Sequence, residues 1–248
     1  MQLQYFNTQA FSNIGTTLQH APAGFRYGFI NNIFKESEYE NLISTFPDVR
    51  RFKLVDKMSG GGRKRFYTGP VYNANTHLGC ICHFHYLSSL WKNVLGEAFS
   101  DEFKLRLSQF AGMPFNSVSV FGFTYGNEGC VQEPHVDGAV REYDEGPIKS
   151  VLTAIIYMNR SPEGSSGTCM YAPDRSTVLF QAPRLRNGLF FFEQHPQAWH
   201  GFPIMPQDTE RHILALAYSN EKIPIKLKKS WAHRLYCKNF WRSVIRQQ

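Results

Sequence analysis

Residues 149–158 read KSVLTAIIYM, a short run of β-branched and apolar side chains that is typical of a strand. Five more runs of this kind lie after residue 115, separated by Gly, Pro, Asn and Asp. They are SVSVFGFTY (117–125), GTCMYA (167–172), TVLFQA (177–182), GLFFFE (188–193) and HILALAYS (212–219). Short strands at regular spacing, divided by turn residues, indicate a sandwich or barrel. The sequence therefore predicts a mainly β fold with a jelly-roll core, a double-stranded β-helix, over residues 115–220.

The first 114 residues are predicted to form a helical support region of the same domain. Three segments have apolar side chains at helical spacing: NNIFKESEYENLISTFPD (31–48), LSSLWKNVLGEAF (87–99) and SDEFKLRLSQFAGM (100–113). Ser37 and Ser100 are the predicted N-caps of the first and third, and Pro47 ends the first. Between the first two helices, SGGGRKRF (59–66) predicts a solvated loop, with phosphate binding as the alternative.

Composition is that of a folded soluble protein, with 42% hydrophobic and 19% charged residues. The start of the chain has no basic stretch followed by an apolar run, so no secretory signal is expected. No apolar stretch approaches the roughly 18 residues of a membrane-spanning helix. Five cysteines are an odd count without a framework spacing, which predicts reduced thiols. A cytoplasmic location is therefore expected.

The charge is concentrated at the end of the chain. Residues 221–248 hold eight of the 27 basic residues and one of the 20 acidic residues, which leaves 19 of each sign in the first 220. Trp231, Leu235, Trp241 and Ile245 are mixed among these charges. Basic residues with tryptophans favour docking on an anionic membrane surface, as a peripheral membrane protein does. A helix packed back on the body with its lysines in solvent is an equally favoured alternative, and nucleic-acid binding is a less favoured one.

A metal site is suggested by EPHVDG (133–138). Alternate side chains of an extended strand share a face, so His135 and Asp137 project together, about 6.6 Å apart along the chain. A third ligand must come from elsewhere, and His200 in QAWHGFP (197–203) is the candidate. Two histidines and one carboxylate with open positions form the facial triad favoured by non-haem Fe(II) oxygenases. Zinc in the same set, serving hydrolysis, is the alternative metal.

Arg211 opens the last strand, eleven residues after His200. In that strand Arg211, Ala215 and Ala217 share one face. A buried arginine offers a planar, charged fork for a carboxylate, and small alanines beside it leave room for a ligand. The sequence therefore predicts an anion-binding pocket close to the metal.

With these residues in place, the chain from about 120 to 220 resembles the Fe(II)- and 2-oxoglutarate-dependent oxygenases, in particular their prolyl-hydroxylase-like branch. The resemblance implies that His135, Asp137 and His200 hold the iron. It also implies that Arg211 pairs with the C5 carboxylate of 2-oxoglutarate. Tyr125, ten residues before His135, matches a family tyrosine that lines the co-substrate pocket.

Tyr157 matches a second tyrosine of that pocket, and Gly167-Thr168 corresponds to the start of a core strand in the family. Two features depart from the pattern. The Arg-x-Ser sequence of some relatives is absent after Arg211, and Ala215 stands where others have a hydroxyl group. Contacts to the C5 carboxylate beyond Arg211 and a tyrosine therefore differ from those of such relatives.

The reaction implied by the resemblance is hydroxylation of an unactivated C–H bond, with Fe(II), 2-oxoglutarate and O2 consumed as in the family. The favoured substrate is a small or membrane-associated anionic molecule, such as a glycolipid head group. The alternatives are a prolyl-type protein hydroxylase and, in another class, a catalytically silent metal-binding module. The segments SGGGRKRFYTG (59–69), GAVREYDEGP (138–147) and RSPEGSSG (160–167) are expected to face the substrate.

Overall fold

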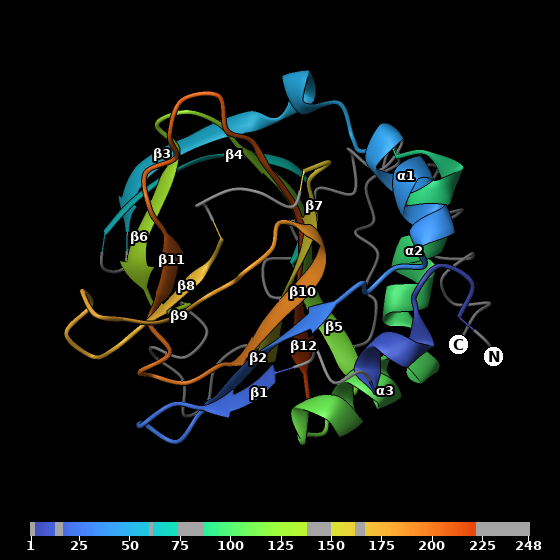
Figure 1. Ribbon diagram of the computed structural model, residues 1–248, viewed down its shortest axis with the longest axis horizontal. Coiled ribbons are helices and arrows are strands. Elements are labelled where there is room, and N and C mark those ends of the chain that lie inside the picture. The colour runs from blue at the N-terminus through green and yellow to red at the C-terminus, as the bar shows by residue number, and fades with distance from the viewer. Residues whose placement is uncertain are drawn as a thin grey trace, which may run out of the picture.

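The computed structural model of the chain describes residues 3–12, 17–59, 62–73, 87–137, 150–161 and 167–221 (Figure 1). Twelve strands of these residues form one sheet in the order β1-β2-β10-β7-β12-β5-β4-β6-β11-β8-β9, with β3 beside β4. They are β1 (Thr17–His20), β2 (Arg26–Asn31), β3 (Lys53–Ser59), β4 (Gly62–Asn73), β5 (Ser117–Gly126), β6 (Val131–His135), β7 (Ser150–Met158), β8 (Cys169–Tyr171), β9 (Val178–Gln181), β10 (Arg186–Glu193), β11 (His200–Phe202) and β12 (Arg211–Ser219). Neighbouring strands run antiparallel.

The sheet curls until β6, β11 and β8 lie opposite β10, β7 and β12 around a common interior (Figure 1). This confirms the predicted jelly-roll core, and each of the six predicted strand runs is a strand. The first 114 residues, predicted as helical support, also contribute β1 to β4. β2 and β4 were not predicted because they pair with β10, β5 and β6, which are distant in the sequence. β1 and β3 then add to β2 and β4 as their neighbours along the chain.

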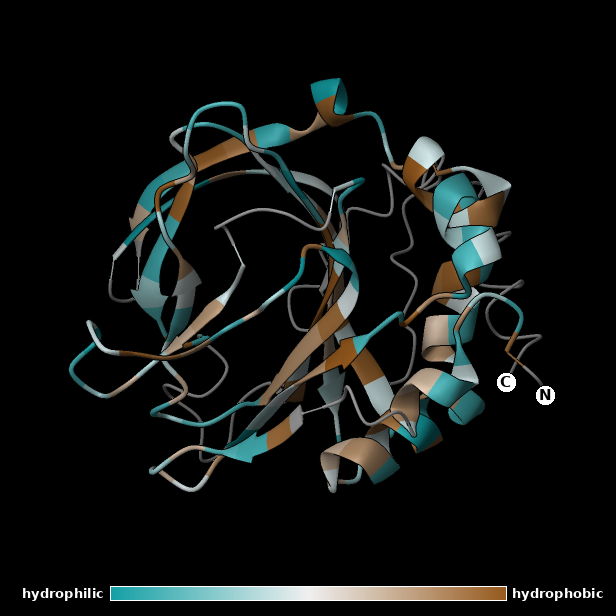
Figure 2. Ribbon diagram, viewed as in Figure 1, coloured by the Kyte–Doolittle hydropathy of each residue, from teal (hydrophilic) through white to brown (hydrophobic). Residues whose placement is uncertain are grey.

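Three helices cover the outer face of the sheet on one side: α1 (Glu36–Ser44), α2 (Ser89–Phe99) and α3 (Asp101–Ala111) (Figure 1). Phe121 and Phe123 of β5 and Leu214 of β12 face them and are fully buried. Trp91 of α2 packs edge-on against Phe123 with ring centroids 5.1 Å apart. Figure 2 shows apolar residues gathered along β2, β10 and β5. This outer core anchors the strands that carry the site.

Alternation along the strands gives the sheet a second apolar face, which lines the barrel interior. Tyr157, Phe190, Phe192 and Ile213 are buried there in a separate cluster. Any residue of β7, β10 or β12 can therefore be assigned to the helix side or the interior by its place in the alternation.

The helix starts follow the predictions in part. The Ser88 and Ser100 hydroxyls accept hydrogen bonds from the backbone N–H groups of Trp91 and Phe103 and so cap α2 and α3. The Ser100 cap is therefore confirmed. The Ser37 cap is wrong, because α1 begins at Glu36 with Lys35 at its N-cap. The chain before it is held extended by a bridge between Phe34 and Phe6 and by the N–H of Lys35, which donates to the carbonyl of Tyr5 at 3.0 Å.

The loop predicted for residues 59–66 is wrong for most of its length. β3 and β4 form a hairpin in which Arg63 lies opposite Met58 and Arg65 opposite Asp56. The Asp56 carboxylate lies 3.7 Å from Arg63 Nε and 3.8 Å from Arg65 Nε. The basic side chains thus have a cross-strand counter-ion, which a solvated loop would not supply.

Several predicted features lie outside the described residues: GAVREYDEGP (138–147), residues 162–166 of RSPEGSSG and the basic tail from residue 222 onward. Within the described ranges the longest helices have 11 residues. A bilayer-spanning helix needs about 20, so no helix of these ranges crosses a membrane.

Candidate metal centre

The structure brings together the three predicted metal ligands. His135 ends β6 and His200 begins β11, and the two residues face each other in the register of these strands. Asp137 follows β6 by two residues, and its Oδ1 lies 3.7 Å from His135 Nε2 and 3.6 Å from His200 Nε2. One ligand atom from each residue lies within 4.8 Å of the others. Strand pairing therefore joins residues that are far apart in the sequence into one site.

Backbone carbonyl groups orient both imidazoles. His135 Nδ1 donates to the carbonyl of Glu133 and His200 Nδ1 donates to the carbonyl of Ala198, each at 3.0 Å. This tautomer leaves the lone pair on Nε2, the atom that points to Asp137. That lone pair of His135 accepts a hydrogen bond from the Gln132 side-chain amide at 3.0 Å, and a metal ion bound at Nε2 would take the place of this bond. The histidines are thus oriented as nitrogen ligands.

Protonation states in the site also suit a metal ion. Burial, with the neighbouring His200, lowers the pKa of His135 to about 4. Burial opposes ionisation of Asp137, but the two imidazoles hold the pKa of this carboxyl well below its usual value. At neutral pH the site therefore presents a carboxylate and a neutral imidazole, and binding a metal need not displace a proton from either.

The low pKa of His135 predicts acid sensitivity of the metal-free protein. The unfolded chain binds a proton at this histidine near pH 6.5 and the folded chain only near pH 4, so stability falls as the pH drops through that window. The loss from this group is about 3 kcal/mol. Urea unfolding with a chelator at a series of pH values measures it, and His135→Gln should show a shallower fall. An identical pH dependence in the two proteins would contradict the assignment.

Arg211 lies in the barrel interior and is only 4% exposed. Its Nη2 donates to Thr168 Oγ1 at 2.7 Å, and its guanidinium carbon lies 4.3 Å from the ring centroid of Phe202. Tyr157 donates its hydroxyl to the same Thr168 oxygen at 2.8 Å and accepts the Thr168 N–H at 2.9 Å. Arg211, Thr168 and Tyr157 therefore form one buried polar group, which we call the arginine cluster.

The arginine cluster and the metal centre share the same interior. The Phe192 ring lies 4.3 Å from the His200 ring, and Phe192 belongs to the same buried cluster as Tyr157. Thr168 was not predicted as a site residue. The one feature of the sequence that could have drawn attention to Thr168 is the preceding glycine. A Cβ at Gly167 would lie 2.3 Å from the backbone oxygen of Ala182, so the position requires glycine. That close approach marks a packed turn but does not indicate what the threonine binds.

Tyr125 lies elsewhere, contrary to the prediction. In the β5–β12 register Tyr125 pairs with His212, whereas Arg211 pairs with Gly126. Paired residues share a face, so Tyr125 points to the helix side. There its hydroxyl donates to Glu210 Oε1 at 3.0 Å, and its ring lies 4.9 Å from that of His212. The structure therefore separates Tyr125 from the arginine cluster.

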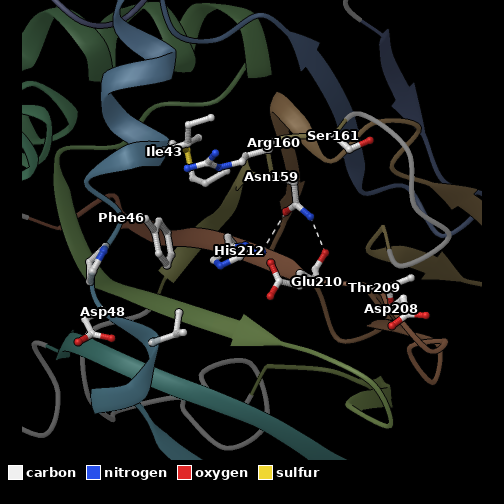
Figure 3. A pocket seen from close by; sticks show the side chains of 13 residues that line it. Ile43, Phe46, Asp48, Asn159, Arg160, Ser161, Asp208, Thr209, Glu210 and His212 are labelled. Carbon is white, nitrogen blue, oxygen red and sulfur yellow. Dashed lines mark hydrogen bonds between the residues drawn. The ribbon is translucent and has the colours of Figure 1, made fainter.

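A cavity of about 760 Å³ lies on the helix side, close to Tyr125. It is lined by Ile43, Phe46, Pro47, Asp48, Val49, Met158, Asn159, Arg160, Ser161, Asp208, Thr209, Glu210 and His212 (Figure 3). The Asn159 side chain holds one wall, because it donates to the carbonyl of Glu210 and accepts the N–H of His212. Met158 and His212 face this cavity, and the preceding residues Tyr157 and Arg211 face the barrel interior.

The structure places two other histidines, His212 and His195, away from the centre. His212 faces the helix-side cavity, with its ring 4.9 Å from that of Phe46. His195 stacks on Phe25 at 5.6 Å and accepts the N–H of Gln197. Neither belongs to the group of atoms that can hold one ion.

No family model and no curated protein matches this sequence. Solved structures do. A 2OG-Fe(II) oxygenase family oxidoreductase from Burkholderia pseudomallei has a TM-score of 0.54 at 11% identity, over 87% of this chain and 90% of that one. A Pseudomonas putida prolyl-4-hydroxylase also has a TM-score of 0.54, at 13% identity over 87% of this chain and 99% of that one.

A third similar structure is the non-haem α-ketoglutarate-dependent epimerase SnoN from nogalamycin biosynthesis. Its TM-score is 0.51 at 14% identity, over 78% of this chain and 77% of that one. At such identities the likeness establishes the fold. The chain therefore has the fold of 2-oxoglutarate-dependent iron oxygenases, and its own residues must carry the argument for chemistry.

Proposed function

We propose that this chain is an Fe(II)- and 2-oxoglutarate-dependent dioxygenase that hydroxylates an unactivated C–H bond. The observation that carries the proposal is the convergence of His135 Nε2, His200 Nε2 and Asp137 Oδ1 at the interior of this fold. A buried arginine cluster in the same interior supports it. A hydrolytic zinc site would give Arg211 no evident role.

The donor set fits iron. Two atoms that each lie about 2.1 Å from an ion are at most about 4.2 Å apart, and the two Asp137-to-histidine distances of 3.7 and 3.6 Å fall within that limit. All three ligand atoms lie within 4.8 Å of one another, so a bound ion would draw the two imidazoles together by no more than about 0.6 Å. Two imidazoles and one carboxylate leave three positions of an octahedral ion open. Bound iron would supply the activation of O2, with 2-oxoglutarate as the co-substrate that provides electrons. The chain itself supplies ligand geometry and a largely apolar interior.

Arg211 is the residue proposed to hold the far carboxylate of 2-oxoglutarate. Its guanidinium is fixed by Thr168 and by the face of Phe202, so it loses little freedom on binding an anion. Burial lowers the pKa of Arg211, yet arginine stays charged in proteins. Thr168 and Tyr157 bring two further hydroxyl groups to the same place. The proposed role of Tyr125 in this pocket is not retained.

Arg211→Met is expected to weaken 2-oxoglutarate binding with little effect on metal binding. A charge-assisted contact to a carboxylate is worth about 1.5–3 kcal/mol, or roughly a tenfold to over a hundredfold change in affinity. Titration of the anaerobic Fe(II) protein with 2-oxoglutarate, followed by the visible charge-transfer band, measures it. Arg160→Met is the matched control, because Arg160 is exposed and lines the helix-side cavity. Equal affinity in Arg211→Met and the wild type would refute the assignment.

For the substrate, we propose a small or membrane-associated anionic molecule, with a glycolipid head group as an example. The support is positive charge on two parts of the chain. Lys64 of β4 pairs with Gln132 of β6, the strand that ends at His135. The basic tail, residues 221–248, would dock a cytoplasmic enzyme on an anionic membrane surface.

The second candidate is a prolyl-type protein hydroxylase, favoured by the fold shared with the Pseudomonas putida prolyl-4-hydroxylase. Succinate release with anionic lipid head groups and with proline-containing peptides, each as the only added substrate, decides between the two. Co-sedimentation with anionic vesicles, with and without residues 222–248, tests the tail. A catalytically silent metal-binding module would show the charge-transfer band but release no succinate above background with any substrate.

A further inference from the structure

The two carboxylate oxygens of Asp137 have different surroundings. Oδ1 faces the histidines, 3.7 Å from His135 Nε2 and 3.6 Å from His200 Nε2. Oδ2 accepts two hydrogen bonds, from Gln194 Nε2 at 2.8 Å and from Thr153 Oγ1 at 3.3 Å. One oxygen of the carboxylate therefore lies at the metal centre, and the other is hydrogen-bonded to Gln194 and Thr153, which we call the Gln–Thr clamp.

The Gln–Thr clamp is built on the rigid part of the sheet. Thr153 lies in β7 opposite Phe192 of β10, and Gln194 directly follows β10. The Gln194 backbone N–H continues the ladder by donating to the carbonyl of Val151 at 2.9 Å. Both clamp residues are therefore fixed by the pairing of β7 with β10, whereas Asp137 lies beyond the end of its own strand.

Hydrogen-bond directions in the clamp follow from the chemistry of its groups. An ionised carboxylate only accepts, so Gln194 must present its amide NH2 group and not its carbonyl. The second amide proton goes to Thr153 Oγ1, and the threonine hydroxyl proton goes to Asp137 Oδ2. Each proton has one acceptor. The carboxylate of a glutamate at position 194 would instead repel Asp137.

We infer that Gln194 and Thr153 are positioning residues that make Asp137 a one-oxygen ligand. With Oδ2 held by the clamp, Oδ1 alone faces the ion, and three positions of an octahedral ion stay open. If both oxygens bound, only two positions would remain, too few for a two-atom co-substrate contact together with O2. The inference rests on the proposed function for the identity of these ligands, but the clamp itself acts on metal binding alone.

The test is Co(II) binding to the full chain, measured by calorimetry and by the visible absorption of the bound ion. Gln194→Met keeps the length of the side chain and removes its donors, and Thr153→Val keeps the branched shape and removes the hydroxyl. Loss of such partners typically weakens metal affinity about 10–100-fold. We expect that loss in each variant, together with a changed absorption spectrum because Asp137 is free to turn.

Two conservative variants keep the test interpretable. Thr153→Ser retains the hydroxyl, and Gln197→Met makes the same exchange as Gln194→Met at an exposed position of the same connection. Both should bind Co(II) as the wild type does, and thermal unfolding of each protein checks the fold. Wild-type affinity and spectrum in Gln194→Met and Thr153→Val would overturn the inference.

The outcomes also separate this inference from the proposed function. Co(II) binding requires neither 2-oxoglutarate nor O2, so a failure to bind the co-substrate would overturn the proposed function and leave the clamp intact. Absence of Co(II) binding in the wild type would overturn both. Weakened binding in the serine and Gln197 variants as well would show a general loss of structure and count against the clamp.

Discussion

His200→Ala is expected to abolish the Fe(II)–2-oxoglutarate charge-transfer band and all turnover. His200 supplies one of three ligand atoms, and it is the only one that comes from β11. Structural zinc sites with four ligands bind with about 10–16 kcal/mol, so one ligand contributes on the order of 3 kcal/mol, or more than a hundredfold in affinity. His135 and Asp137 alone would then hold the ion too weakly at ordinary concentrations.

The matched control is His195→Ala. His195 lies five residues earlier, stacks on Phe25 and is not among the residues that converge at the centre, so this variant removes the same kind of side chain from the same connection. It should keep the band and the metal affinity. Metal affinity in His200→Ala that equals that of His195→Ala would show that His200 is not a ligand.

Gly201→Ala is expected to damage the site by a different route. A Cβ at Gly201 would lie 2.1 Å from the backbone oxygen of Gln132, in the neighbouring strand β6. A backbone oxygen cannot relieve the clash by changing rotamer as a side chain can, so β6 and β11 must move apart. Such overpacking costs about 1–3 kcal/mol, and a backbone contact belongs at the upper end.

Separation of these strands also moves His135 from His200, which face each other across them. Gly201→Ala should therefore lower both the free energy of unfolding and the metal affinity, as urea titration and Co(II) calorimetry would show. Pro203→Ala, an exposed change just after β11, should alter neither. Normal stability and metal affinity in Gly201→Ala would mean that the strands tolerate the extra carbon without moving apart.

The sequence predicted the features that depend only on residues close together in the chain. KSVLTAIIYM is a strand because its own side chains favour one, and Ser100 caps a helix because the acceptor and the N–H group lie three residues apart. His135 and Asp137 were predicted as ligands from the same kind of short-range spacing, and the structure brings them together. His200 and Arg211 required a family pattern as well, because nothing local joins them to residues 135–137.

The features that were missed depend on pairing between distant segments. Tyr125 was assigned to the pocket by family resemblance, but its face is set by its pairing with His212 in β12. β3 and β4 contain glycines and charges typical of a loop, and they are strands because Asp56, β5 and β6 provide partners. Gln194 and Thr153 meet Asp137 only in the folded sheet.

At the start of β12, the two adjacent residues Arg211 and His212 face opposite sides of the sheet. Arg211 faces the barrel interior and His212 faces the helix-side cavity. If β12 shifted by one residue against β5 and β7, each of the two side chains would point to the opposite face of the sheet. This shift would move the guanidinium away from Thr168 and turn Leu214 and Leu216 out of the outer core. The register of this strand is therefore fixed by chemistry on both faces at once. Single-residue insertions or deletions inside β12 should be among the least tolerated length changes in the chain.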